Sequence, residues 1–100
     1  MTKNNRLVDI KTIRERKKVC APGQEFVFRL PSGQEVGRAK DIIEFTDRLK
    51  TVPLQSVLYH ANKNHFDSWL EFIGESGVAS RIKNVKGDGE DVRKTILGRI

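Results

Sequence analysis

The fold is decided by residues 53–73, which read PLQSVLYHANKNHFDSWLEFI. Two apolar stripes lie in this stretch: Leu54, Val57, Leu58 and Ala61, followed by Phe66, Trp69, Leu70 and Ile73. In each stripe the apolar residues recur at i, i+3, i+4 and i+7, which is one face of an amphipathic helix. Pro53 is tolerated in a first helical turn, Asn64 can cap the second helix, and Gly74 offers a C-terminal stop. The stretch therefore predicts two consecutive helices.

Three more helices are predicted, one before this pair and two after it. A first helix, over about residues 39–50, has an apolar stripe of Ile42, Phe45 and Leu49 with Ile43 beside it. Ser76 is a candidate cap for a helix that follows Gly74, and Asp88 is a candidate cap for the last one. The inward residues of these two helices are Val78, Ala79, Ile82 and Val85, and Val92, Ile96, Leu97 and Ile100.

The segment before these helices has the period of a β-strand. Phe26, Phe28 and Leu30 alternate with polar or smaller residues, which is typical of a half-buried strand. Pro31-Ser32-Gly33 can form a short turn, and residues 34–37 can return, so residues 25–37 predict a hairpin. A lone hairpin is unstable and must pack on the helices. We therefore expect one α+β domain over residues 23–100, with a helical majority and a hairpin packed on four or five short helices.

The positive charge of the chain is concentrated before this domain. Residues 1–20 hold seven Lys and Arg against two acidic residues, whereas residues 21–100 hold twelve against eleven. Leu7, Ile10 and Ile13 could form one face of a short helix, but such a helix is marginal in water without a partner. We expect residues 1–22 to be a flexible basic arm that ends near the Ala21-Pro22-Gly23 break.

Nucleic acid is one candidate partner for the arm. Phosphate contacts would come from its cations: Lys11, Arg14, Arg16, Lys17 and Lys18. The alternative is a solvated arm that keeps the protein soluble. The arm lacks aromatic residues that could stack on bases, and the helices show no cationic recognition face, so the charge pattern favours the solvated arm.

Catalytic and metal-binding patterns are weak in this sequence. His60, His65 and Asp67 lie close together, but their spacing fits no familiar zinc pattern. We expect His60 to be half-buried and to bond to the backbone. Cys20 is the only cysteine, so an internal disulfide cannot form, and nothing near it in sequence supports a nucleophile. We expect no cofactor, no metal and no enzymatic activity.

The expected compartment follows from the absence of membrane-spanning and secretory patterns in the sequence. No apolar run approaches the roughly 20 residues that span a bilayer, and the polar N-terminus does not resemble a secretory signal. We expect no membrane association and a cytoplasmic location, where a single thiol stays reduced.

Residues 56–70 carry a family resemblance. This segment resembles a small prokaryotic domain of unknown function that is found beside pyruvate/phosphoenolpyruvate-binding (dikinase-like) domains and beside glycosyltransferases. The positions that fit its motif are Tyr59, His60, Asn64, Phe66, Trp69 and Leu70, with Val78-Ala79 where the family usually has Leu-Ala. His65 departs from the usual aspartate. The resemblance covers about residues 25–100 and implies an accessory or regulatory module without catalytic residues.

Together these observations favour a non-enzymatic accessory or protein-interaction module with a protein partner. The alternative is a small nucleic-acid-associated protein that binds phosphates through its basic arm.

Overall fold

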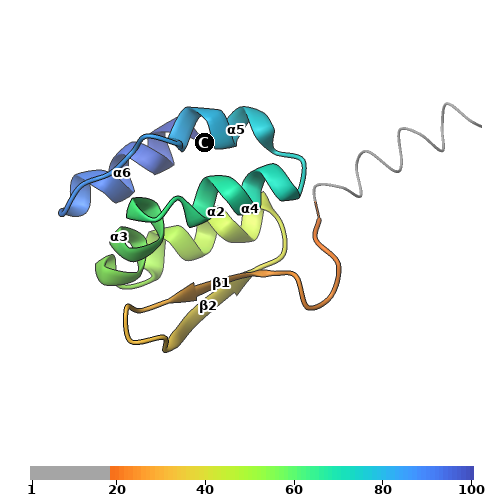
Figure 1. Cartoon of the computed structure of the whole chain (residues 1–100), viewed down its shortest axis with the longest axis horizontal. Coiled ribbons are helices and arrows are strands. Elements are labelled where there is room, and N and C mark those ends of the chain that lie inside the picture. The colour runs from red at the N-terminus through yellow and green to blue at the C-terminus, as the bar shows by residue number, and fades with distance from the viewer. Residues whose placement is uncertain (1–18) are drawn as a thin grey trace, which may run out of the picture.

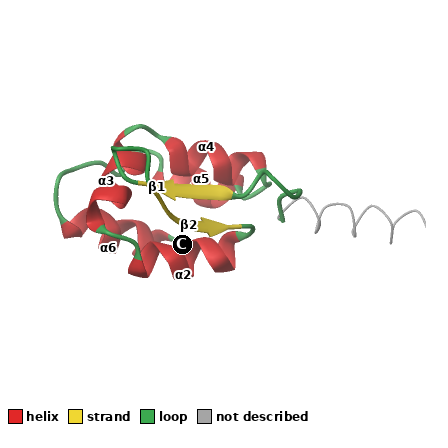
Figure 2. Cartoon of the chain, turned by 90° about the horizontal axis from the view of Figure 1, so that it is seen from below, coloured by secondary structure: helices red, strands yellow, loops and turns green. Residues whose placement is uncertain are grey.

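The computed structural model describes residues 19–100. These residues form a two-stranded hairpin and five helices (Figures 1 and 2): β1 (Phe26–Arg29), β2 (Glu35–Ala39), α2 (Ile42–Thr51), α3 (Leu54–Asn62), α4 (His65–Phe72), α5 (Ser76–Ile82) and α6 (Glu90–Arg99). The predicted α+β fold with a helical majority is therefore confirmed. The predicted flexible arm lies outside the described residues, except for its last few positions.

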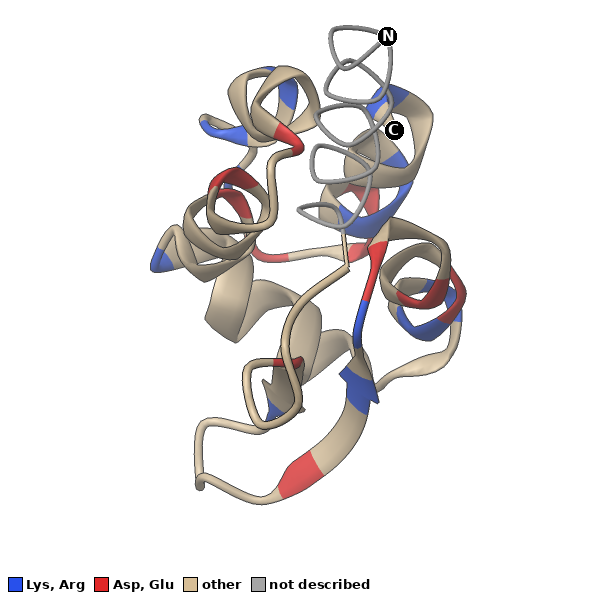
Figure 3. Cartoon of the chain, turned by 90° about the vertical axis from the view of Figure 1, so that its right-hand side faces the viewer, with Lys and Arg blue, Asp and Glu red and all other residues tan. Residues whose placement is uncertain are grey.

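The elements are arranged in layers. In Figure 1 the hairpin lies along one side, α2, α3 and α4 lie in the middle, and α5 and α6 cover the far side. Strand β1 contacts α3, strand β2 contacts α2, and α6 contacts α2, α3 and α5. Basic and acidic residues are interspersed over the helices (Figure 3), which fits the near balance of charge after residue 20. No helix within residues 19–100 is long and apolar enough to cross a membrane.

The hairpin is two residues longer at its C-terminal end than predicted. Its strands are antiparallel, Phe26 is paired with Ala39, and the register shifts between Phe28 and Arg29. Because Ala39 is buried in this ladder, the predicted helix start at about residue 39 is wrong. Asp41 caps α2 instead: its carboxylate accepts a hydrogen bond from the Glu44 backbone N–H at 2.9 Å.

Three of the predicted helix caps differ from the structure. Asn64 occupies the N-cap position of α4 in the left-handed conformation (φ 61°), and its side chain makes no capping bond. The loop between α3 and α4 is only two residues long and requires this backbone turn, so the amide is free to accept from Lys86 Nζ at 2.6 Å. Ser76 is the first residue of α5, after the N-cap Glu75. Asp88 precedes Gly89, which is the N-cap of α6 and has no side chain to cap with.

The C-terminal stop at Gly74 is confirmed. Gly74 has φ +95°, a conformation that glycine adopts without steric cost. The next residue, Glu75, donates its backbone N–H to the Leu70 carbonyl at 2.8 Å. This is the bond pattern of a left-handed helix terminus, and it turns the chain sharply from α4 into α5.

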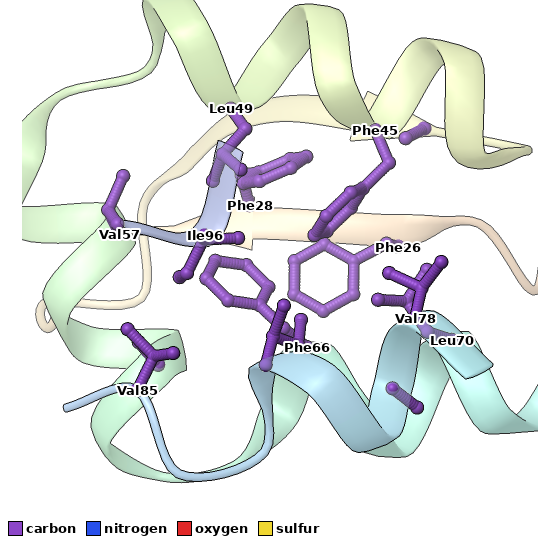
Figure 4. Close-up of a cluster of buried hydrophobic side chains, with 14 of the residues drawn as sticks. Phe26, Phe28, Phe45, Leu49, Val57, Phe66, Leu70, Val78, Val85 and Ile96 are labelled. Atoms are coloured by element: carbon purple, nitrogen blue, oxygen red, sulfur yellow. The ribbon is translucent and has the colours of Figure 1, made fainter. Parts of the chain in front are cut away.

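Phenylalanine rings form the centre of the core (Figure 4). Phe28, Phe45 and Phe66 are almost fully buried, and they come from the hairpin, α2 and α4. Leu49, Val57, Leu70, Ile73, Val92 and Ile96 complete the most buried set. Val78, Ala79 and Ile82 of α5 are also buried, so each of the five helices contributes apolar residues to one shared core.

Two residues of these stripes lie elsewhere than predicted. Trp69 is only partly buried and packs at the edge of the core, where its indole Nε1–H donates to the Gln24 carbonyl at 3.0 Å. Ile43, expected beside the inward stripe of α2, is 71% exposed. One helix turn presents only part of its circumference to the core, and Ile42, Phe45 and Leu49 already fill that part.

Candidate functional site

His60 is the one buried ionisable side chain among residues 19–100. It lies on the inner face of α3, is 4% exposed, and stands among aromatic rings at centroid distances of 4.8 Å for Phe26 and 5.5 Å for Phe66. Its Nε2 accepts a hydrogen bond from the Arg29 backbone N–H at 2.8 Å. The expected backbone bond is confirmed, but the ring is more deeply buried than expected.

His65, at the start of α4, makes the second contact of His60. The two Nδ1 atoms are 2.9 Å apart, a hydrogen-bond distance that requires one proton between them. Because His60 Nε2 is already an acceptor, its ring must carry its single proton on Nδ1 and donate it to His65. His65 is then an acceptor at Nδ1 and carries its own proton on Nε2. The geometry thus fixes both rings as neutral, each in a defined tautomer.

The environment of His60 opposes a positive charge on its ring. Burial is the main cause, and the neighbouring His65 and Arg29 add to it, so that the pKa of His60 falls from 6.5 to about 4. A histidine that stays neutral at neutral pH can serve as a hydrogen-bond acceptor or as a metal ligand.

A metal centre needs more ligands than this pair provides. The part of the chain that the structure describes has no group of three or more His, Cys, Asp or Glu side chains that could hold an ion. The sequence places Asp67 near the two histidines, but its side chain instead lines a polar pocket between α4 and α5, together with Ser68, Glu71 and Lys83. What the structure shows at this pair is a hydrogen-bond network.

The remaining motif residues have separate roles. Phe66 belongs to the core, Asn64 makes the turn between α3 and α4, and Trp69 ties the segment before β1 to α4. Tyr59 is only half-buried, and it lines a shallow pocket with Pro31 of the hairpin turn and Leu58 of α3. Lys63 Nζ lies 5.7 Å from the centre of the Tyr59 ring, within the range of a cation–π contact.

A second surface feature is a groove between α2, α5 and the end of α6, which we call the Ile43 groove. It is lined by Ile42, Ile43, Thr46, Asp47, Glu75, Val78 and Ile100. Its floor is apolar, and its two charged residues are both acidic. The sequence analysis missed this groove because it placed Ile43 beside the inward stripe of α2. Ile43 lies outside the i, i+3, i+7 series of Ile42, Phe45 and Leu49, and this position was the signal for an exposed side chain.

The candidate phosphate-contacting residues lie outside the described part of the chain, which is residues 19–100. They are Lys11, Arg14, Arg16, Lys17 and Lys18.

Cys20 lies near the start of the described chain, and its backbone N–H donates to the Lys40 carbonyl, just before α2, at 3.0 Å. Burial raises the pKa of the Cys20 thiol, with Glu25 adding to the effect. This disfavours the thiolate that a nucleophile needs.

Comparisons of the chain with protein-family models, with curated proteins and with solved structures found no match. The resemblance to the small prokaryotic domain stays a prediction.

Proposed function

We propose that this chain is a non-enzymatic protein-interaction module whose Ile43 groove holds a basic, amphipathic segment of a partner protein. The observation that carries the proposal is the 71% exposure of Ile43 at the rim of a groove that also includes Ile42, Val78 and Ile100. A large aliphatic side chain gains from leaving water, and helix-lined apolar grooves commonly hold amphipathic helices.

Charge indicates what kind of segment would fit. Asp47 of α2 and Glu75 before α5 are the charged residues that line the groove. Neither makes an ion pair within residues 19–100. An apolar segment that carries Lys or Arg beside its apolar face would therefore find both an apolar floor and two carboxylates that form no ion pair with the described residues. An acidic segment would be repelled.

The rest of the described surface is consistent with a binding role. His60 and His65 are hydrogen-bonded to each other, and His60 is also hydrogen-bonded to the backbone. The family resemblance implies an accessory module, which also supports a role in contacting other proteins.

The test is a photocrosslinking experiment in cells. A photoreactive amino acid replaces Thr46 in the groove wall, and a second sample carries it at the exposed Ser80 on α5. We expect a partner to be captured from position 46 and not from position 80. The peptide joined to the groove should show apolar residues at helical spacing and flanking Lys or Arg.

Matched substitutions then separate specific from general effects. Ile43→Asp and Asp47→Arg should each abolish capture from position 46, while Asp88→Arg, which changes the net charge equally at an exposed loop, should leave it intact. Ile43 is mostly exposed, so the variant should keep its thermal midpoint. Capture that survives both groove substitutions would contradict the proposal. A crosslink to residues 7–18 of the same chain would instead assign the groove to its own N-terminal segment.

A further inference from the structure

The hydrogen bond from Arg29 to His60 has an unusual position in the fold. Among the described hydrogen bonds, it is the one that joins strand β1 to helix α3. The His60–His65 bond continues the chain of contacts to the first residue of α4. The two bonds together connect the hairpin, α3 and α4 through a single imidazole ring, so its protonation state affects all three elements.

Neither ring can take up another proton without the loss of one of these hydrogen bonds. A proton added to His60 must go to Nε2, which then can no longer accept from the Arg29 N–H. A proton added to His65 must go to Nδ1, which then faces the Nδ1–H of His60. In the first case the part-buried Arg29 N–H loses its partner, and in the second the ring N–H of His60 loses its partner. Each case costs a hydrogen bond in a partly buried site.

The groups that surround the rings do not compensate a positive charge. From β1 the network faces Arg29, which is itself cationic. From α3 it faces Tyr59, whose ring centroid lies 4.9 Å from that of His60 and 5.6 Å from that of His65, with Lys63 beyond it. Strand β2 places Glu35 opposite Arg29, but Glu35 is paired with Arg38. Phe26, Phe28 and Phe66 supply the remaining neighbours.

The shallow pocket at Tyr59 lies across the same junction. Its wall combines Pro31, at the tip of the hairpin, with Gln55, Leu58, Tyr59, Asn62 and Lys63 of α3 and the turn after it. A change in how the hairpin sits on α3 therefore changes the shape of this pocket.

We propose that the His60–His65 pair is a proton-operated latch that holds the Arg29 end of β1 on α3 and α4 when both rings are neutral and releases that end when the pair takes up a proton. Acidification then loosens the Arg29 end of β1 and opens the pocket between Pro31 and Tyr59, while Phe26 and Phe28 stay in the core and the helices remain assembled. The low pKa of His60 agrees with this arrangement, because it reports that the folded environment resists the added proton. The latch does not depend on the Ile43 groove, so either proposal can fail alone.

The latch is tested by nitrogen-15 NMR of the full chain, titrated from neutral pH to below about pH 4. At neutral pH the ring signals should show the Nδ1–H tautomer for His60 and the Nε2–H tautomer for His65. On acidification, the Arg29 backbone amide and the side-chain signals of Leu58 and Tyr59 should shift together with the His60 ring. The methyl signals of Val92 in α6 should not follow this midpoint.

Two variants make the result decisive. In His60→Phe, which keeps an aromatic ring but removes the acceptor, the pH response of the Arg29 amide should be lost. In His65→Ala, the removal of the neighbouring ring should raise the pH midpoint of His60, which remains measurable if His60→Phe fails to fold. The opposite His60 tautomer at neutral pH would overturn the proposal. So would an Arg29 response that persists in His60→Phe, a His60 midpoint that does not move in His65→Ala, or simultaneous loss of all folded signals on acidification.

Discussion

At the scale of single residues, the buried side chain of His60 makes the free energy of unfolding depend on pH. The pKa of His60 is about 4 in the folded chain against an ordinary value of 6.5, so between these values the unfolded chain binds more protons than the folded chain. Stability therefore rises with pH through this window. The contribution of His60 should be fully present above about pH 6.5 and lost progressively down to about pH 4, by roughly 3 kcal/mol at most.

Urea denaturation at a series of pH values measures this dependence. The parent protein should lose stability between pH 6.5 and about 4, and His60→Phe should show a much flatter profile over the same range. Equal slopes in the two proteins would show that another group carries the acid sensitivity.

A second residue-scale prediction compares two aromatic residues of α4, Phe66 and Trp69. Phe66 is 2% exposed at the centre of the core, so Phe66→Ala should cost about 3–5 kcal/mol, which is a large part of the stability of a small domain. Trp69 packs at the core edge and ties down Gln24. Trp69→Phe should therefore leave the domain folded while it frees the segment before β1.

Thermal unfolding and amide exchange check this pair of variants. We expect a large drop in the melting temperature for Phe66→Ala, and for Trp69→Phe a small drop with faster exchange at Cys20, whose N–H bond to Lys40 lies in the same segment. If Trp69→Phe were as destabilising as Phe66→Ala, the tryptophan would belong to the core after all.

At the scale of the elements, an arginine of α6 caps the C-terminal end of α2 with hydrogen bonds. Arg93 donates from one terminal guanidinium nitrogen to the Leu49 carbonyl at 2.9 Å and to the Val52 carbonyl at 2.7 Å. Its guanidinium also pairs with Glu90 at 2.9 Å. The last carbonyls of a helix have no partner within the helix, so Arg93 satisfies groups that the sequence of α2 leaves open.

The corresponding prediction uses a matched pair on the same helix. Arg93→Met keeps much of the apolar stem but removes the donors, and it should cost about 1–3 kcal/mol because two partly buried carbonyls lose their partner. Lys94→Met, at an exposed position, should change the free energy of unfolding by less than about 0.5 kcal/mol. Urea denaturation compares the two, and equal effects would mean that the Arg93 bonds do not stabilise the fold.

At the scale of the whole molecule, the uneven charge distribution decides how the chain would bind nucleic acid. Residues 21–100 carry twelve Lys and Arg against eleven acidic residues, so any binding should depend on the arm and be independent of base sequence. Each phosphate contact contributes about 0.9 to the slope of log affinity against log salt for duplex DNA, and about 0.7 for single strands. Replacement of Arg14, Arg16, Lys17 and Lys18 by Gln should therefore lower that slope by up to about 3.6 for duplex DNA and about 2.8 for single-stranded RNA.

Fluorescence anisotropy with labelled duplex DNA and single-stranded RNA, over a range of salt, measures this slope. Replacement of Lys83, Lys86, Lys94 and Arg99 by Gln provides a control with the same change in net charge. If the control weakened binding as much as the arm variant, the folded domain rather than the arm would be the nucleic-acid contact.

The order of the elements could be predicted from the sequence, but several of their ends and some residue roles could not. The hairpin and five helices follow from apolar periodicity, which reports burial directly. The end of β2 at Ala39 depends on pairing with Phe26, and the conformation of Asn64 depends on how closely α4 follows α3. Such features arise from contacts between segments, and local sequence carries little information about them.

The candidate sites show the same division. The sequence by itself determined the α+β fold with a helical majority, because residues that recur at helical or strand spacing must leave water together. Only the tertiary structure decided that His60 joins Arg29 to His65, that Trp69 lies at the core edge, and that Ile43 faces a groove. These features depend on which residues meet across the chain and on how much of each helix surface the core covers. Both are set only when the layers pack against one another.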